Sequence, residues 1–505
     1  MRRSNVLLVV LDAVRKDHLS CYGAERRTTP TLERLAADPD GVAYEHAVSA
    51  APWTLPSHAS MFTGRYPSHH RCIGTHPNLD ADQPVVAELL QAAGYDTFGF
   101  SNSSFTGTAR GYARGFDGYH DLQELPRAGG QYYELSPEYA KLVVNNVRRG
   151  DDASYFQTKK LESRLRRAGR TGDPFFGFVN LNSAHSPYDP PASYREWAEA
   201  GFEGRDRVRM DVVEQFSEDA YAYMAGHIDP TDEEWELLRR WYDGEIRYLD
   251  DLLAGVVGTL ERADRYDDTT IVVTADHGEH FGEFGLAYHQ FSLSEVLVNV
   301  PLVVKWARGL GPERIRAAST GEATSDEAAT GVTAGDASND ATIGDGTAAT
   351  PVATARADEL VSLVDLAPTF LDLAGVADRP ATMQGRSLLS EPEPAVVFAE
   401  YGFPYPKLLE RKVRKHGDHF GRWNRALQAA RTRTHKLVVA SDGESILYEL
   451  VDGVEVPVED DAVATVLADA IDATLASLDP AAADDEPDAD LDEHVTAHLE
   501  HLGYL

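Results

Sequence analysis

The chain has 505 residues and a formal net charge of −35. Hydrophobic residues make up 43% of it, which is enough to build a core and excludes a chain that is disordered throughout. The acidic excess would repel phosphate groups, so the composition argues against partners such as nucleic acids or anionic membranes. Only two cysteines occur, Cys21 and Cys72, so we expect no disulfide framework and no cysteine-rich zinc site.

No apolar run reaches the roughly 18–20 residues that span a bilayer. The first run, residues 6–11, is too short for the core of a signal peptide. We therefore predict a cytoplasmic protein with no membrane span. Only nine of the 47 basic residues are lysine, and the acidic residues are spread along the whole chain. This balance resembles the proteins of halophilic archaea, and it predicts a fold that loosens at low salt.

Four short apolar runs are predicted strands, and each is followed by polar residues. They are residues 6–11 before Asp12, 97–100 before Asn102, 175–181 before Asn182 and His185, and 269–274 before Asp276 and His277. Stretches of helical period lie between them, for example residues 84–93 and 234–253. This alternation predicts an α/β fold with a doubly wound, mostly parallel sheet and flanking helices. Ligands bind at the carboxyl edge of such sheets, where these polar residues would meet.

The composition divides the chain into three regions. Residues 1–394 form the predicted α/β catalytic domain, and within it residues 310–358 have almost no large apolar side chain and are predicted to be a disordered insertion. Residues 395–478 contain short strand-like pieces, which predict a smaller antiparallel sheet with a packing helix. Residues 479–505 are predicted to be an acidic linker and a terminal helix.

Two of the predicted strands end in residues that suit a metal ion. In TADHGEHFGE, residues 274–283, the Asp276 carboxylate and the His277 imidazole follow a strand directly. Such oxygen and nitrogen ligands suit Mn, Zn, Ca or Mg. The alternative is that Asp276 is a helix N-cap and His277 a loop histidine. Asp12 follows another strand, and this residue is either a further ligand or the N-cap of a helix.

The segment APWTLPSHASMF, residues 51–62, carries a candidate nucleophile. Pro56 at a first helical position predicts that a helix begins there, just after Thr54. A hydroxyl at a helix N-terminus beside a metal ion can form an ester with an anionic group, which backbone N–H groups then hold. The alternative is that Thr54 is only a helix cap.

Seven segments together resemble, in order, the sulfatase-like branch of the alkaline phosphatase superfamily. They are NVLLVVLDAVRKDHLSCYG, TLPSHASMFTGRYP, GYDTFGFSN, NSAHSPYDPP, YDGEIRYLD, TADHGEHFGE and LVDLAPTFLDLAG. The resemblance covers nearly the whole chain. It implies one divalent metal ion, of unknown identity, held by Asp12, Asp276 and His277, and Thr54 at the nucleophile position. It further implies that His185 lies beside the leaving-group oxygen.

The chain departs from the family pattern at four positions. Ala13 follows Asp12 where sulfatases usually have a second aspartate, and Thr54 stands where a cysteine or serine would become formylglycine. Oxidising a threonine gives a ketone, so no formylglycine is expected. His58 replaces the signature arginine, and Asn102 replaces a lysine. The predicted site therefore keeps its metal ligands and loses positive charge around the anion.

These departures favour a metal-dependent phosphodiesterase or phosphonate-ester hydrolase that works through Thr54. In this mechanism His58 or Asn102 steadies the developing charge and His185 protonates the departing alkoxide. His289 is a further predicted substrate contact, because many relatives place a lysine or histidine nearby. The alternatives are a sulfuric ester hydrolase of the arylsulfatase type, a transferase that passes a phospho-group to a sugar or lipid acceptor, and a catalytically degenerate anion-binding protein. The substrate is expected to be a small-molecule, glycan or lipid ester, and the oligomeric state is left open.

Overall fold

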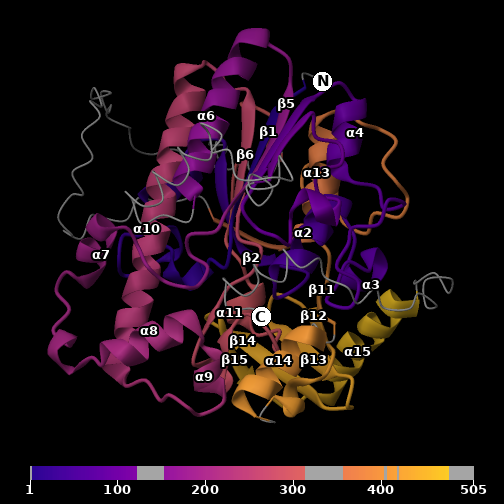
Figure 1. The fold of residues 1–505 in the computed structure, drawn as a ribbon. Coiled ribbons are helices and arrows are strands. Elements are labelled where there is room, and N and C mark those ends of the chain that lie inside the picture. The colour runs from indigo at the N-terminus through magenta and orange to yellow at the C-terminus, as the bar shows by residue number, and fades with distance from the viewer. Residues whose placement is uncertain (1–2, 122–152, 313–355, 403–405, 418–419, 477–505) are drawn as a thin grey trace, which may run out of the picture.

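The computed structural model describes residues 3–121, 153–312, 356–402, 406–417 and 420–476 (Figure 1). Most of the predicted insertion at 310–358 and all of the predicted acidic linker and terminal helix at 479–505 lie outside the described residues. The last residues assigned to the insertion begin a strand at Arg356 instead. Residues 356–358, at the end of the predicted insertion, therefore lie in a strand.

An eight-stranded sheet forms the centre of the molecule, with strand order β10-β2-β9-β6-β1-β5-β3-β4. Only β9 runs antiparallel to its neighbours β2 and β6, while all other pairs are parallel. The predicted doubly wound, mostly parallel sheet is therefore confirmed. The strands are β1 (Asn5–Leu11), β2 (Gly41–Val48), β3 (Asp96–Ser101), β4 (Gly118–Asp121), β5 (Phe175–Leu181), β6 (Thr269–Thr274), β9 (Leu302–Lys305) and β10 (Arg356–Ser362).

The four predicted strands are β1, β3, β5 and β6, and β1 lies between β5 and β6. All residues of β1, β5 and β6 are buried, as expected for strands covered on both faces. Val10 is in register with Thr274 on one side and with Asn180 on the other. The parallel register therefore brings the residues that follow these three strands to one edge of the sheet.

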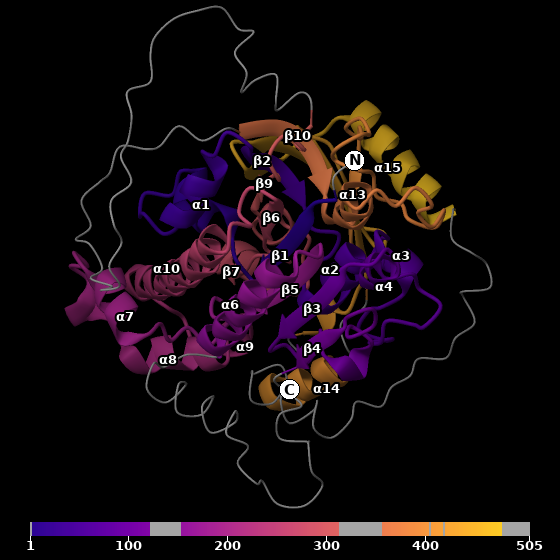
Figure 2. The ribbon, with the colours of Figure 1, turned by 90° about the horizontal axis from the view of Figure 1, so that it is seen from above.

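Helices cover both faces of this sheet (Figures 1 and 2). On one face lie α6 (Ser154–Thr171) and the long α10 (Asp232–Arg262), which contact each other. On the other lie α2 (Thr54–Thr63), α4 (Val86–Ala92) and α13 (Leu366–Leu373). A capping box between Thr231 and Glu234 fixes the start of α10. Among the described residues of the main body, the remaining α-helices are α1 (Pro30–Ala36), α3 (Pro67–His70), α7 (Ala192–Glu199), α8 (Met210–Glu218), α9 (Tyr221–Met224) and α11 (Glu295–Val298).

A separate five-stranded antiparallel sheet follows, in the order β11-β12-β13-β14-β15. Its strands are β11 (Val397–Tyr401), β12 (Leu427–Arg431), β13 (His435–Ala440), β14 (Ser445–Val451) and β15 (Val454–Pro457), with α14 (Pro406–His416) between the first two. Leu467 and Ile471 of α15 (Asp461–Ala476) pack on it. The predicted small sheet with a packing helix is confirmed. A short two-stranded sheet, β7 (His280–Phe281) with β8 (Ala287–Tyr288), completes the fold.

Buried ion pairs join the small sheet to the main body. Arg431 and Lys436, which are 2% and 0% exposed, both contact the Glu295 carboxylate, at 2.9 and 3.0 Å. Glu455 of β15 pairs with the same lysine, at 2.5 Å. These two cations and two anions form a cluster that we call the Glu295 cluster.

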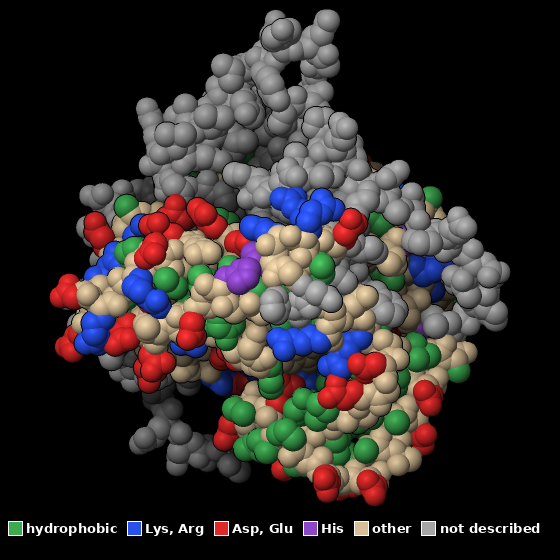
Figure 3. Space-filling model, turned by 60° about the horizontal axis from the view of Figure 1, so that its bottom comes forward, with side chains coloured by type: hydrophobic (Ala, Val, Ile, Leu, Met, Phe, Trp, Pro, Cys, Tyr) green, Lys and Arg blue, Asp and Glu red, His purple; other side chains and the backbone are tan. Residues whose placement is uncertain are grey.

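Within the described residues, no helix is long and apolar enough to cross a membrane. Acidic side chains are scattered over the face drawn in Figure 3, with basic ones between them. The acidic side chains visible on this face are therefore not gathered in one patch.

Candidate active site

The start of α2 places the predicted nucleophile in the molecule. Thr54 is the first helical residue and Trp53, in an extended conformation, precedes it. The prediction that Pro56 occupies the first helical position is therefore wrong by two residues, and Thr54 is not the cap. Pro is tolerated here because N–H groups in the first turn have no partner within the helix. Ser57 donates to the Asp276 carbonyl oxygen at 2.8 Å and ties the helix to the end of β6.

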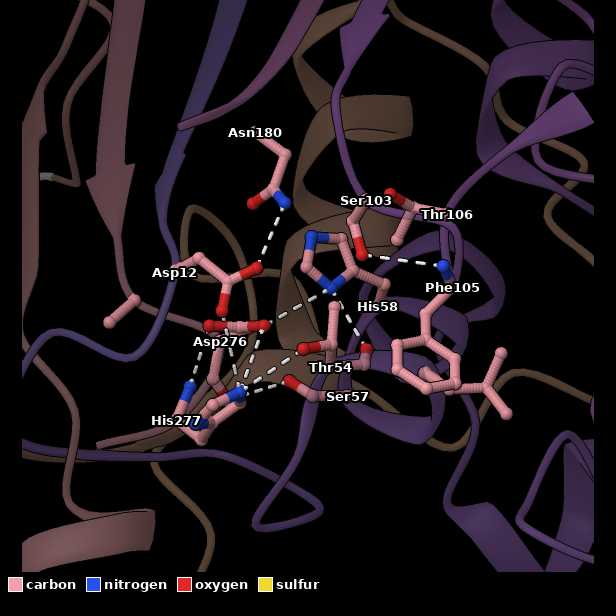
Figure 4. A network of polar contacts seen from close by, with 12 residues as sticks. Asp12, Thr54, Ser57, His58, Ser103, Phe105, Thr106, Asn180, Asp276 and His277 are labelled. Carbon is pink, nitrogen blue, oxygen red and sulfur yellow. Dashed lines mark hydrogen bonds and ion pairs between the residues drawn. The ribbon is translucent and has the colours of Figure 1, made fainter. Parts of the chain in front are cut away.

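Asp12, Asp276 and His277 come together beside Thr54 (Figure 4). One ligand atom from each of the three lies within 4.8 Å of the others, and all three residues are buried. Among the described residues this is the only such group that could hold a metal ion. Nε2 of His277 lies 3.6 Å from Oδ1 of Asp12 and 3.4 Å from Oδ2 of Asp276.

The tautomer of His277 follows from its neighbours. Nδ1 lies 2.8 Å from the carbonyl oxygen of Gly278, which can only accept, so Nδ1 carries the proton. Nε2 then presents a lone pair toward both carboxylates, and the Thr54 hydroxyl donates to it at 3.2 Å. Burial, followed by the nearby His289, holds the pKa of His277 well below its ordinary value, which agrees with a neutral ring.

The electrostatics of this group fit a divalent cation. Burial and the neighbouring charge of Asp12 raise the pKa of Asp276 well above its ordinary value. Oδ2 of Asp276 is buried and accepts no hydrogen bond from any described residue. Two carboxylates and an unprotonated imidazole nitrogen, whose ligand atoms lie within 4.8 Å of one another, are a donor set that suits a hard or borderline divalent ion.

Two asparagines hold the Asp12 carboxylate. The side-chain amides of Asn180 and Asn182 both donate to Oδ2, at 3.1 and 3.2 Å. The backbone N–H of Ala13 donates to Oδ1 of Asp276 at 3.2 Å. The sequence interpretation noted Asn182 as the polar residue after a strand but missed Asn180. Its signal was available, since it is a polar residue near the end of an otherwise apolar run.

His58 lies one turn into α2, fully buried. Its Nδ1 donates to the carbonyl oxygen of Thr54 at 2.9 Å and lies 3.5 Å from Oδ2 of Asp276. Burial lowers the pKa of His58 to about 4, so the ring is neutral near pH 7. No Lys or Arg of the described residues forms a hydrogen bond or ion pair with Thr54, His58, Asp276 or His277.

His185 and His289 reach the same region from two different loops. The His289 ring centroid lies 4.2 Å from that of His277 and 5.1 Å from that of His185. Nδ1 of His185 donates to the Ser186 carbonyl oxygen at 2.7 Å. Glu279 lies 3.0 Å from Nδ1 of His289, and burial raises the pKa of this carboxyl to about 8. The structure thus groups the predicted leaving-group acid, the predicted anion contact and a predicted metal ligand.

Asn102 is a further predicted site residue. It follows β3 and is half-buried. No hydrogen bond joins it to Thr54, Asp276 or His277. A role for Asn102 toward the substrate stays a prediction.

Comparison with known proteins identifies the family of the chain. The sulfatase family model matches residues 4–376, well over half of the chain. Arylsulfatase K of Bos taurus is 24% identical over 470 residues, covering 89% of this chain and 76% of the relative. The multifunctional alkaline phosphatase superfamily protein PehA of Trinickia caryophylli is 25% identical over 360 residues, covering 60% and 68%.

A solved structure shares the fold over nearly its whole length. The phosphonate monoester hydrolase SpPMH from Silicibacter pomeroyi superposes with a TM-score of 0.63 at 22% identity, covering 94% of this chain and 95% of that one. Members of the matched family use a divalent metal, and the Asp12, Asp276 and His277 group is a candidate site for it. The chain belongs to the sulfatase family and is a hydrolase of ester bonds.

Proposed function

We propose that this protein is a metal-dependent hydrolase that cleaves phosphate diesters or phosphonate esters through Thr54 as the nucleophile. The observation that carries the proposal is the 3.2 Å contact between the Thr54 hydroxyl and Nε2 of His277, beside two buried carboxylates. When bound by Asp12, Asp276 and His277, a divalent ion supplies positive charge that favours an ionised hydroxyl and polarises the ester.

The chain's own residues account for the remaining steps. Thr54 is the first residue of α2, a position where free backbone N–H groups and the helix dipole favour a negative charge. Thr54 releases its hydroxyl proton to solvent, its oxygen attacks phosphorus, and the bond between phosphorus and the leaving-group oxygen breaks. His185 gives a proton to the departing alkoxide and then accepts one from the water that hydrolyses the Thr54 ester. Asn180 and Asn182 keep the Asp12 carboxylate in place throughout.

The charge of the site favours a substrate with a single negative charge. His58 occupies the position where the family pattern has arginine. No Lys or Arg among the described residues forms a hydrogen bond or ion pair with Thr54, His58, Asp276 or His277. A phosphate monoester carries close to two negative charges near pH 7, whereas a phosphate diester or a phosphonate monoester carries one. Because no Lys or Arg among the described residues contacts Thr54, His58, Asp276 or His277, the metal ion alone would balance a second charge, and we expect monoanionic esters to be preferred.

A sulfate monoester also carries one charge and is the competing substrate. The family match and the sulfatases among the relatives favour it. The chemistry of Thr54 argues against it, because a threonine cannot become formylglycine and sulfate release would then need attack at sulfur. The names of SpPMH and PehA support phosphonate or phosphate ester chemistry on a similar fold.

Initial rates on four chromogenic esters test the proposal. The purified protein is assayed in molar KCl with Mn, Zn, Ca or Mg on a phosphate diester, a phosphonate monoester, a phosphate monoester and a sulfate monoester. We expect the diester or the phosphonate ester to be cleaved fastest. Preferential sulfate cleavage would overturn the proposal in favour of a sulfatase. Product ester formed from an added alcohol would indicate a transferase instead.

If the protein binds no metal and cleaves none of the four esters, the alternative of a catalytically degenerate anion-binding protein would be favoured.

A further inference from the structure

We propose that Tyr242 is a positioning residue for the metal site. Its phenol holds the backbone at Ala13 in a left-handed conformation, and that conformation keeps the Asp12 and Asp276 carboxylates side by side. The inference rests on the proposed metal-dependent function. It concerns a residue that touches neither the predicted nucleophile nor the predicted ligands' side chains.

The turn that follows Asp12 has an unfavourable backbone conformation. Ala13 is fully buried and has a φ of 61°, in the left-handed region. In that region Cβ crowds the backbone, and alanine has no polar side chain with which to offset the cost by a local hydrogen bond. Contacts from the surrounding structure must therefore hold the residue there.

Both backbone polar groups of Ala13 have partners outside the turn. Its N–H donates to Oδ1 of Asp276 at 3.2 Å, and its carbonyl oxygen accepts from the Tyr242 hydroxyl at 2.6 Å. The same hydroxyl oxygen accepts the N–H of Arg15 at 2.7 Å. One phenol thus closes the turn at its two ends, while the N–H inside the turn faces a predicted metal ligand.

The position of Tyr242 is itself fixed by packing. The residue lies on α10, is fully buried, and its ring is packed among aromatic neighbours. Ring centroids of His18 and Phe281 lie 5.0 Å away, both edge-to-face, and that of Tyr188 lies 5.7 Å away. Because packing fixes this ring, its hydroxyl has a fixed position relative to α10. The hydrogen bonds of the hydroxyl therefore hold the turn at Ala13 in place relative to α10.

The arrangement matters because this site has few carboxylates. Ala13 occupies the position where the family pattern has a second aspartate, so Asp12 and Asp276 supply the only two carboxylates of the described ligand group. If the turn relaxed to an ordinary conformation, the Ala13 N–H would leave Asp276 and the two carboxylates would no longer converge. We therefore expect metal affinity to depend on the Tyr242 hydroxyl.

Four variants and the wild type test this inference. They are Tyr242→Phe, Ala13→Gly, the double variant, and the control Tyr248→Phe, which removes a hydroxyl from a buried tyrosine of α10 that packs on Tyr194. The Kd for Mn²⁺ is measured by titration calorimetry in molar KCl, and Tm is measured on the same samples. Glycine adopts the left-handed conformation without cost, so it separates the conformation from the hydrogen bond.

We expect Tyr242→Phe to weaken Mn²⁺ binding about tenfold, and Ala13→Gly and Tyr248→Phe to change it by less than about twofold. The double variant should bind Mn²⁺ at least about threefold more tightly than Tyr242→Phe. Equal Kd values for Tyr242→Phe and wild type would overturn this inference alone. A double variant that binds no better than Tyr242→Phe would also overturn it, since the phenol would then not act through the backbone at Ala13. A wild-type protein that binds no Mn²⁺ would overturn the proposed function and this inference with it.

Discussion

The hydroxyl of Thr54 lies 3.2 Å from Nε2 of His277, although the two residues are 223 positions apart in the chain. The first residue of α2 and the loop after β6 meet because Ser57 ties the helix to the Asp276 carbonyl oxygen. The contact places a nucleophilic oxygen directly against the candidate metal group.

Replacing Thr54 with alanine removes the attacking oxygen. We expect Thr54→Ala to lower kcat by at least about 10³-fold, because the loss of a covalent nucleophile leaves only binding and electrostatic contributions. Thr54→Ser, which keeps the hydroxyl, is the matched control and should retain measurable turnover. Steady-state rates on the best ester measure both. Full activity in Thr54→Ala would mean that water, not threonine, attacks the substrate.

Removing the metal should abolish activity reversibly. We expect a chelator to stop turnover and added divalent ion to restore it, while Asp276→Asn weakens the affinity for the ion because one charged ligand is lost. Ion at 100 times its Kd should stabilise the fold by about 2.7 kcal/mol. Activity and Tm are followed together during chelation and refilling. A Tm that does not change when the ion is removed and added back would contradict the assignment of this site.

His185 should matter most for substrates with poor leaving groups. We expect His185→Gln to lower kcat about 10²-fold for an alkyl ester, whose alkoxide needs a proton, and far less for a nitrophenyl ester. A series of esters with leaving groups of increasing pKa measures this as a steeper dependence in the variant. An equal loss across the series would mean that His185 does not donate the proton.

Asp250 should make stability depend on pH. It accepts the backbone N–H groups of Thr31 and Leu32 at the start of α1, and burial raises its pKa to about 7. Between the unfolded value near 4 and the folded value, only the folded state keeps this proton, so stability falls as pH rises. The fall is at most about 1.4 kcal/mol per pH unit.

The comparison with Asp250→Asn isolates that contribution. The variant has no titrating group at this position, so its free energy of unfolding relative to wild type should increase from pH 5 to pH 8. Urea unfolding at constant salt measures the difference. If the free energy of unfolding changes equally with pH in the variant and in wild type, the Asp250 carboxyl does not titrate in this range.

The net charge of −35 should make the fold sensitive to salt. Repulsion among scattered acidic side chains acts against the compact state, and the Debye length falls from about 10 Å at 0.1 M salt to about 3 Å at 1 M. We expect Tm to rise between these KCl concentrations. An unchanged Tm would remove the basis for a halophilic origin.

Much of the fold could be predicted because β1, β3, β5 and β6 are short apolar runs that end in polar residues. The parallel register then does what the sequence pattern predicts, and Asp12 meets Asp276. The start of α2 could not be placed correctly, because a proline is allowed at several positions of a first helical turn. The role of Tyr242 was also out of reach, since an aromatic residue on the buried face of α10 looks like any other core residue.

The Glu295 cluster could not be predicted from the sequence either. Nothing in the local sequence pairs Arg431 with a carboxylate 136 positions earlier in the chain. Only the packing of the small sheet against the main body brings them together. Ion pairs across such distances in sequence depend on the completed fold.

The Glu295 cluster also bears on how the molecule comes apart. Its two cations and two anions balance, and all four side chains are nearly inaccessible to water. Separating the small sheet from the main body would expose these charges to water or leave them buried without a partner. Removing one partner of a buried ion pair typically costs about 3–5 kcal/mol. Dissolved ions screen the surface but hardly reach this joint. The two sheets should therefore unfold in a single cooperative transition, whose midpoint moves with salt while its cooperativity does not.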